Sequence, residues 1–138
     1  MTEADIHDFA IRYTAAWCSQ EPERLASFYA EDGSLIINDG EPAVGRLAIA
    51  NTAGSFMSGY PDMIVELDRV TMTNGGARYD WRFIGSNSGL RGTGRPVKIS
   101  GYEEWTFSPE GVIQESKGHY DSSDWDRQVK GQQQTNVT

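Results

Sequence analysis

Two neighbouring stretches near the C-terminus carry ionisable side chains at a spacing of two residues. Residues 95–107 and 113–121 both alternate polar with apolar side chains, and they flank the turn-forming run SPEG at 108–111. Because side chains two residues apart on a strand share a face, the pattern predicts an antiparallel hairpin with Glu103 on the apolar face of Ile99 and Trp105. On the second strand, one face is predicted to hold Ile113, Glu115, Lys117, His119 and Asp121.

His119 and Asp121 are candidates for proton transfer. On one strand face they would lie roughly 6 to 7 Å apart. A carboxylate near an imidazole fixes its tautomer or stabilises its charged form, and either arrangement shuttles protons. The alternative is a solvent-exposed charge pair near the end of a strand.

Glu103 is the second candidate, because apolar neighbours on a strand face should raise the pKa of its carboxyl and make it a proton donor. Alternatively, Lys117 on the facing strand neutralises Glu103 as a buried ion pair. Glu115 could also pair with Lys117, so the sequence leaves open which carboxyl keeps its proton.

Tyr13 and a set of large aromatic side chains are expected around the same site. Tyr13 lies one helical turn before Trp17, so its hydroxyl either donates a hydrogen bond into a cavity or is satisfied within the core. Together the aromatic residues indicate a flat, hydrophobic ligand. The candidate ligand contacts are Trp17, Tyr79, Trp81, Phe83, Asn87, Trp105, Glu115 and Lys117.

The remaining pattern predicts the elements that position these residues. Helices come first and strands follow, an order typical of α+β folds with helices on one side of a curved antiparallel sheet. The run NGG at 74–76 is a hairpin turn, and residues 85–94 form a glycine-rich loop. The expected helices are 3–18, a second one starting at Pro22, and 46–58; the expected strands are 34–38, 63–73, 77–84, 95–107 and 113–121.

Composition excludes several classes of protein. The net charge of -8, from 20 acidic and 12 basic residues, argues against a nucleic-acid surface. The single cysteine favours a reducing cytoplasm, and no apolar run is long enough to span a membrane. No metal-ligand spacing and no nucleotide-binding motif occurs, so we expect no metal and no cofactor. Residues 1–130 should form a single domain, followed by a flexible tail over 131–138.

Three stretches together resemble the nuclear-transport-factor-two-like superfamily: RYTAAWCSQEPERLASFYAEDGSLIIND, GRLAIA and TGRPVKISGYEEWTFSPEGVIQESKGHYD. Within it, the chain is most similar to SnoaL-like polyketide cyclases and ester cyclases, and more distantly to steroid delta-isomerases. The resemblance spans about residues 6 to 130. It implies a cone-shaped α+β barrel, in which three N-terminal helices pack on a curved antiparallel sheet and enclose a pocket.

The resemblance also implies roles for individual residues. Asp121 matches the acid/base aspartate of the SnoaL-like cyclases, and Glu115 matches the acid of their G-x-I-x-E run. Asn87 stands in GSNSG where many relatives carry a histidine. Tyr13 matches the oxyanion-hole tyrosine of the isomerases and Glu103 the strand acid beside it, whereas the isomerase base has no clean counterpart.

Two functions follow as hypotheses. The first is a cofactor-free enzyme that cyclises or isomerises a small hydrophobic carbonyl compound, with Asp121 and His119 moving the proton and Tyr13 or Glu103 stabilising the enolate oxygen. The second is a non-catalytic module that binds a small ligand or mediates dimerisation. A homodimer through the outer face of the sheet is expected in either case.

Overall fold

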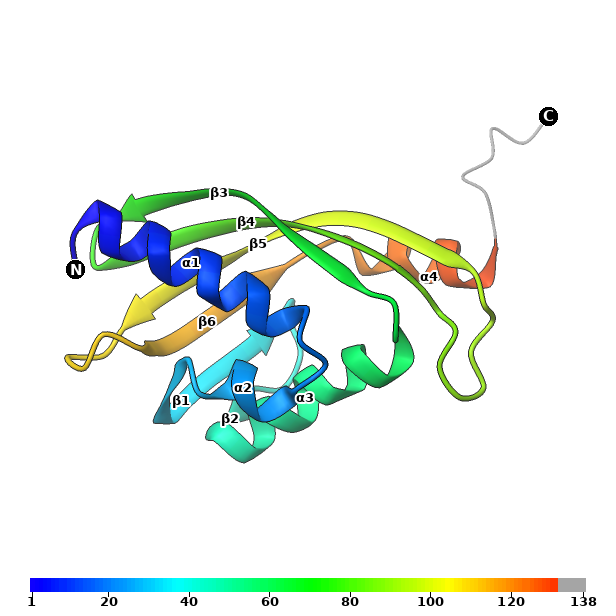
Figure 1. The fold of residues 1–138 in the computed structure, drawn as a ribbon, viewed down its shortest axis with the longest axis horizontal. Helices are drawn as coiled ribbons and strands as arrows, with labels where there is room; N and C mark the ends of the chain where they lie inside the picture. The colour runs from blue at the N-terminus through cyan, green and yellow to red at the C-terminus, as the bar shows by residue number, and fades with distance from the viewer. Residues whose placement is uncertain (132–138) are drawn as a thin grey trace.

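The structure is a computed structural model of the chain, and it describes residues 1–131. The tail predicted at 131–138 therefore falls almost entirely outside the described residues. Figure 1 shows helices at the N-terminal end of the chain followed by long curved strands, with a further helix after the last strand. The helices are α1 (Glu3–Trp17), α2 (Pro22–Ala26), α3 (Arg46–Gly59) and α4 (Ser122–Lys130).

Helix α1 begins with a reciprocal capping box. The Asp5 backbone N–H donates to Thr2 Oγ1 at 3.1 Å, and the Thr2 backbone N–H donates to Asp5 Oδ2 at 2.9 Å. These bonds satisfy two donors that a helix N-terminus would otherwise leave unpaired. One side of the helix is buried, including Phe9 and Tyr13. The helix predicted at 3–18 is confirmed.

The segment after α1 differs from the expectation. Helix α2 is only five residues long, and strand β1 (Tyr29–Ile37) begins five residues before the strand expected at 34–38. The cause is a tertiary contact, because the Phe28 carbonyl accepts a hydrogen bond of 2.8 Å from the Ile113 backbone N–H and draws this segment into the sheet. Helix α3 agrees with the prediction to within a residue.

Over residues 1–131, six strands form a single curved sheet in the order β2-β1-β6-β5-β4-β3. All neighbouring strands are antiparallel except β1 and β6, which are parallel. The predicted turns at 74–76 and 108–111 join β3 to β4 and β5 to β6, and Gly111 takes a φ of 81° in the second turn. The other strands are β2 (Ala43–Val44), β3 (Ile64–Thr73), β4 (Gly76–Ser86), β5 (Pro96–Phe107) and β6 (Ile113–His119).

An irregularity in β6 decides which of its side chains face the core. Thr106 pairs with Glu115, but the next residue of β5, Phe107, pairs with Ile113, so Gln114 is an extra residue in β6. A bulge of this kind reverses the inward and outward positions beyond it. Ser116 and Gly118 are therefore buried. The predicted common face of Ile113 with Glu115, Lys117 and His119 is wrong.

The core is dominated by aromatic rings between α1 and the sheet. Tyr79 stacks on Trp105 with their ring centroids 4.8 Å apart, and the Tyr13 ring meets the Trp105 ring edge-on at 5.0 Å. Tyr13, Tyr79 and Trp105 are almost fully buried. Figure 1 shows α1 running across the face of the long strands. The predicted α+β fold, with helices packed against a curved sheet, is confirmed, although the sheet is not closed into a barrel.

Helix α4 was not predicted. The Asp121 side chain caps its N-terminus by accepting a hydrogen bond of 3.1 Å from the Asp124 backbone N–H. Gly131 ends the helix in the left-handed conformation, with a φ of 73°. Trp125 projects from α4 into the core and donates a hydrogen bond of 2.6 Å from its indole nitrogen to the Tyr60 hydroxyl.

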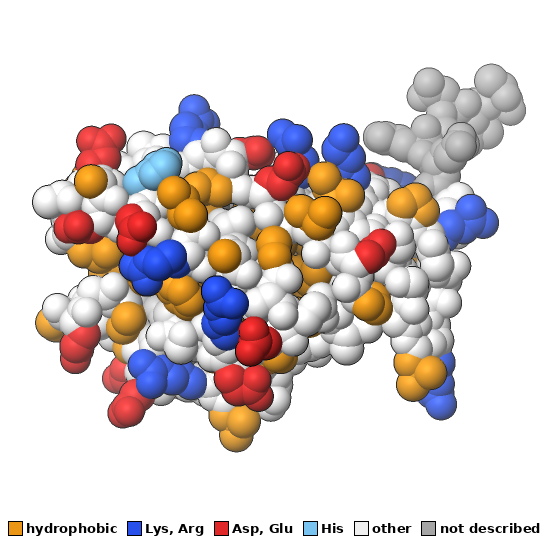
Figure 2. Space-filling view, viewed as in Figure 1, with side chains coloured by type: hydrophobic (Ala, Val, Ile, Leu, Met, Phe, Trp, Pro, Cys, Tyr) orange, Lys and Arg blue, Asp and Glu red, His pale blue; other side chains and the backbone are white. Residues whose placement is uncertain are grey.

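The surface mixes both signs of charge. Figure 2 shows Lys and Arg side chains interspersed with Asp and Glu on the face of the molecule that α1 occupies. The ion pair of Arg82 with Asp68 joins β4 to β3, and that of Arg78 with Asp80 lies within β4. Within residues 1–131, no helix is both long and apolar enough to cross a membrane.

Candidate functional site

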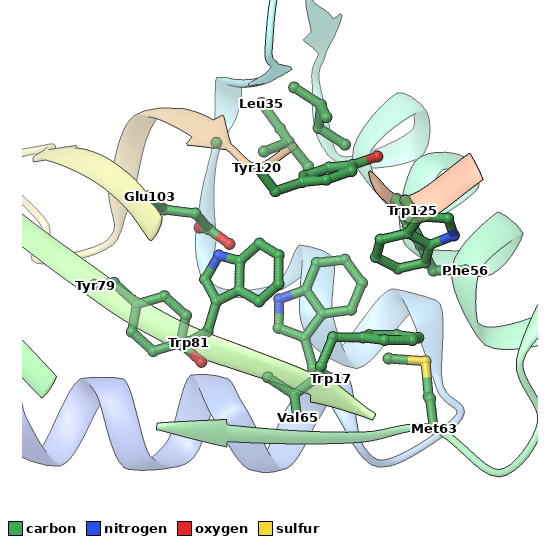
Figure 3. A pocket seen from close by; sticks show the side chains of 13 residues that line it. Trp17, Leu35, Phe56, Met63, Val65, Tyr79, Trp81, Glu103, Tyr120 and Trp125 are labelled. Atoms are coloured by element: carbon green, nitrogen blue, oxygen red, sulfur yellow. The ribbon is translucent and has the colours of Figure 1, made fainter. Parts of the chain in front are cut away.

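A cavity of about 60 Å³ lies between the inner face of the sheet and the helices. Figure 3 shows it surrounded by aromatic rings, with one carboxyl group directed into it from β5. By the usual requirement of about 10 to 15 Å³ for one water molecule, the cavity holds several waters or one small organic molecule. Its walls are formed by Trp17, Leu35, Ile37, Phe56, Met63, Val65, Tyr79, Trp81, Phe83, Glu103, Gly118, Tyr120 and Trp125.

Among the described residues, Glu103 supplies the only carboxyl group in this wall. It is only 6% exposed. Its Oε1 accepts three hydrogen bonds, from the Tyr13 hydroxyl at 2.9 Å, the Trp105 indole nitrogen at 2.8 Å and the Ser116 hydroxyl at 2.8 Å. No donor within residues 1–131 bonds to Oε2. The three donors therefore fix the orientation of the carboxyl and leave its second oxygen to the cavity.

Burial raises the pKa of Glu103 above its usual range, although the bonds from Trp105, Ser116 and Tyr13 oppose the shift. Since three donors occupy Oε1, the proton of the neutral acid resides on Oε2. When Glu103 is neutral, its proton therefore faces the cavity. This is the arrangement that a group needs in order to exchange a proton with a bound molecule.

The hydroxyl of Tyr13 belongs to a buried relay behind Glu103. Because the Tyr13 hydroxyl donates its hydrogen bond to Glu103, the bond of 2.8 Å between the Tyr13 and Tyr29 hydroxyls must be donated by Tyr29. Burial raises the pKa of both tyrosines well above the usual value, so both stay neutral donors. Tyr13 does not line the cavity itself. Its contact is with Glu103, which makes it a positioning residue in this structure.

His119 and Asp121 lie away from the cavity. His119 faces the outer side of the sheet, where its Nε2 lies 2.8 Å from Glu104 Oε1 and its ring stacks on Tyr102 with the centroids 4.6 Å apart. Asp121 is exposed and caps α4. The expected convergence of these two side chains with Glu103 is not found. A catalytic role for either one stays a prediction that the geometry does not favour.

Glu115 and Lys117 also lie on the outer side of the sheet. Their side chains approach each other to 3.7 Å, so the pairing of these two residues is found, whereas Gly118 stands opposite Glu103. The extra residue at Gln114 accounts for both positions. A contact of either side chain with a ligand in the cavity is not supported by the geometry.

Most of the predicted aromatic contacts do meet at the cavity. Trp17, Tyr79, Trp81 and Phe83 line it, while Trp105 lies behind it and donates to Glu103. The Tyr79 hydroxyl lies 2.6 Å from Thr14 Oγ1, and burial raises the pKa of Tyr79.

Asn87 lies in the loop between β4 and β5, away from the cavity. Its side-chain oxygen accepts a hydrogen bond of 2.8 Å from the Thr93 backbone N–H. Asn87 therefore stabilises its own loop and is not brought to the cavity.

Several residues of the cavity wall were not predicted from the sequence. Phe56, Tyr120 and Trp125 line the cavity but were not among the expected ligand contacts. A signal for Trp125 existed in its spacing of four residues from Val129, which is typical of an amphipathic helix. Ser116 had no comparable signal, because its inward position depends on the bulge at Gln114.

A metal site is not evident in the part of the chain that the structure describes. Among residues 1–131, no group of three or more His, Cys, Asp and Glu side chains is arranged to hold a metal ion. Glu103 is surrounded by hydroxyl and indole donors, which suit a hydrogen-bonded carboxyl rather than a metal ligand.

Solved structures share this fold. A protein assigned as a SnoaL-like polyketide cyclase from Jannaschia sp. CCS1 superposes with a TM-score of 0.81 at 13% identity, covering 95% of each chain. AclR from Streptomyces galilaeus, assigned as a hydroxylase, superposes with a TM-score of 0.80 at 14% identity, over 99% of this chain and 87% of that one. At such identities the likeness concerns the fold alone.

A third structure contains a small ligand. It is a protein of ketosteroid isomerase-like fold from Catenulispora acidiphila DSM 44928 in complex with trimethylamine, with a TM-score of 0.78 at 16% identity over 91% of this chain and 94% of that one. No curated protein matches the sequence significantly. The model of the SnoaL-like domain matches residues 10–116, which is most of the chain. The chain therefore belongs to the SnoaL-like domain family.

Proposed function

We propose that this protein catalyses proton transfer at a carbon atom next to the carbonyl group of a small hydrophobic compound, with Glu103 as the group that takes and returns the proton. The observation that carries the proposal is that the two oxygens of the Glu103 carboxyl group have different surroundings. Oε1 of Glu103 is held by three donors, and Oε2 is left to an apolar cavity.

The environment of Glu103 suits this role. A general base works best when its pKa lies near the working pH, and burial moves the pKa of Glu103 upward from the value of a solvated carboxyl. The apolar walls exclude bulk water from the reacting atoms, which strengthens the electrostatic interactions inside. The three bonds to Oε1 hold the carboxyl in one orientation, so the proton always moves through Oε2.

The proposed proton transfer needs no group other than the Glu103 carboxylate. Ionised Glu103 removes a proton from the carbon next to the carbonyl: the C–H bond breaks, an O–H bond forms on Oε2, and the electron pair of the C–H bond passes into the enolate. Returning the proton to another carbon isomerises the compound. Attack of the enolate carbon on a second carbonyl group of the same molecule, followed by protonation of the new alkoxide, closes a ring.

Exchange of deuterium into a ketone tests this proposal directly. Acetone is incubated in D2O with the protein, and loss of its methyl proton signal is followed by NMR against a buffer blank. We expect exchange above the blank, reduced on the order of a hundredfold in Glu103→Gln. The matched control is Glu104→Gln, since Glu104 is the adjacent, exposed residue of β5. Exchange that survives Glu103→Gln would refute the assignment.

A second candidate function is binding without catalysis. The aromatic walls formed by Trp17, Trp81 and Trp125, together with a single carboxyl, would also suit a small alkylammonium ion, which is attracted to aromatic faces. A structural neighbour holds trimethylamine. Under this alternative, trimethylammonium binds with release of the Glu103 proton, and no deuterium enters acetone. Calorimetry in two buffers with different ionisation enthalpies measures that proton release.

The predicted homodimer and cytoplasmic location stay proposals. The outer face of the sheet carries Tyr102 between the Arg78 guanidinium, 3.8 Å from its ring centroid, and the ring of His119. A half-exposed aromatic residue of this kind suits the centre of an interface. Sedimentation of the wild type and of Tyr102→Glu tests the dimer, because a buried carboxylate at its centre would separate the subunits. A monomeric wild type would refute it.

A further inference from the structure

Trp81 carries a buried hydrogen-bond donor that has no partner in the described part of the chain. Its ring lines the cavity, and its indole Nε1 is sealed from solvent without an acceptor within residues 1–131. An unpaired buried donor destabilises a folded protein, so each one in a native protein calls for a water or a ligand that accepts its hydrogen bond. Figure 3 shows the indole nitrogen turned toward the carboxyl of Glu103. The two polar groups thus meet at one end of an otherwise apolar cavity.

The position of the Trp81 ring is fixed by the sheet beneath it. Trp81 pairs with Gly101 across the β4–β5 ladder, and a Cβ atom at Gly101 would lie 2.4 Å from Cζ2 of the indole ring. The ring therefore occupies the space that a side chain at position 101 would fill. Tyr120 packs against it with the ring centroids 6.0 Å apart. The direction of the N–H is consequently set before any ligand arrives.

We infer that the Trp81 indole N–H donates a hydrogen bond to an oxygen of the ligand, and that Trp81 thereby makes the site selective for carbonyl compounds. This inference rests on the proposed function and adds the residue that recognises the substrate. The ligand it implies is small, has an apolar body, and places an acceptor oxygen at Trp81 and an acidic C–H bond at Glu103. An alkylammonium ion has no acceptor and leaves the Trp81 donor unpaired.

The role of Trp81 in the reaction follows from charge. When Glu103 removes the proton, the carbonyl oxygen gains negative charge, and a fixed donor bonds more strongly to an enolate oxygen than to a neutral carbonyl. The indole keeps its own proton throughout. Trp81 would therefore affect the rate more than the affinity for the ketone.

Three ligands with equal numbers of non-hydrogen atoms separate the contributions of the Trp81 hydrogen bond, of apolar contact and of charge to binding. They are acetone, 2-methylpropene and trimethylammonium. Binding is followed in spectra of the indole N–H groups of 15N-labelled protein, with the Trp81 signal identified by its loss in Trp81→Phe. We expect acetone to shift this signal downfield, and 2-methylpropene to leave it nearly unchanged. In Trp81→Phe, the preference for acetone over 2-methylpropene should fall by roughly threefold to tenfold, the worth of one hydrogen bond.

Kinetics and a wall variant complete the test. Trp81→Phe should lower the kcat for deuterium exchange into acetone more than it raises KM. Phe83→Leu changes the same cavity wall but removes no polar atom. It should weaken the binding of acetone and of 2-methylpropene to the same extent. If acetone exchanges through Glu103 but Trp81→Phe alters neither the ligand preference nor kcat, the inference about Trp81 is wrong while the proposed function stands. If the wild type neither binds acetone nor exchanges its protons, both fail.

Discussion

The Ser116 hydroxyl donates a hydrogen bond of 2.8 Å to Glu103 Oε1 from the strand beside it, and both residues are buried. Together with Tyr13 and Trp105, Ser116 holds the oxygen of Glu103 that does not face the cavity. Each donor stabilises the ionised carboxylate more than the neutral acid. The three donors therefore keep a deeply buried carboxyl able to lose its proton.

Ser116→Ala should raise the pKa of Glu103 further, because it removes one of the bonds that lower it. The loss in folding stability should be about 1 kcal/mol, since Oε1 keeps two other donors. Titration of the 13C-labelled Glu carboxyl groups and denaturant unfolding measure the two effects. Ser108→Ala is the control, because Ser108 is buried and its hydroxyl has no partner within residues 1–131. A pKa of Glu103 that moves downward in Ser116→Ala would contradict this account.

Glu103 should also make folding stability depend on pH. Its pKa is raised in the folded state, so between the unfolded and folded values the folded protein binds more protons. The stabilisation is fully present below the unfolded pKa and is lost as the pH rises through the folded one, with a slope approaching about 1.4 kcal/mol per pH unit. Glu103→Gln keeps an acceptor oxygen for the three donors and should remove that slope. Denaturant unfolding of the wild type and of Glu103→Gln at a series of pH values measures this. The same pH dependence of the unfolding free energy in both proteins would contradict the prediction.

The faces of β6 explain why the sequence predicted Glu103 but not its partner Ser116. Alternation placed Glu103 correctly because β5 is regular from Ile99 to Trp105. In β6 the same rule failed, since one extra residue at Gln114 exchanges the two faces and nothing in the local sequence marks it. Bulges depend on pairing with the neighbouring strand, which a single sequence does not display.

The C-terminal helix was missed for a different reason. Asp121 and Asp124 have the spacing of a helix N-terminus, but Asp121 also continues the alternating pattern that predicts a strand over 113–121. The helices at 3–18 and 46–58, the two turns and the aromatic lining carried strong local signals. They were predicted because periodicity and turn residues alone determine them.

Asp121 offers a clean separation between a catalytic role and a capping role. Asn caps helices about as well as Asp, so Asp121→Asn should change neither stability nor deuterium exchange into acetone. Asp121→Ala removes the acceptor for the Asp124 N–H and should cost about 0.5 to 2 kcal/mol of stability, again with little effect on exchange. Unfolding curves and the exchange assay serve both variants. A large loss of exchange in Asp121→Asn would restore Asp121 as the base.

Substitutions at Gly101 and Gly118 form a matched pair that tests whether the position of the Trp81 ring is fixed. A Cβ atom at Gly101 would lie 2.4 Å from the Trp81 ring and 2.5 Å from the His119 carbonyl oxygen, whereas at Gly118 the nearest atoms are 3.6 Å away or more. Gly101→Ala should therefore displace the indole and cost about 1 to 3 kcal/mol of stability. Gly118→Ala should be tolerated. Indole N–H spectra report the displacement, and equal behaviour of the two variants would argue against a fixed ring.

Trp125 should set the upper limit on ligand size. With Phe56 and Tyr120 it lines both the inner cavity and an outer cleft of about 260 Å³ between α3 and α4, so these three rings separate the two spaces. Trp125→Ala should join them and admit cyclohexanone as well as acetone, at a cost of about 3 to 5 kcal/mol. If Trp125→Ala does not fold, Tyr120→Ala opens the same wall by removing a side chain that is only half-buried.

Trp125→Phe is the control. It keeps an aromatic ring in the wall but loses the hydrogen bond to Tyr60, and it should retain the wild-type preference for acetone. Cyclohexanone binding equal in the wild type and both alanine variants would show that these rings do not limit the site.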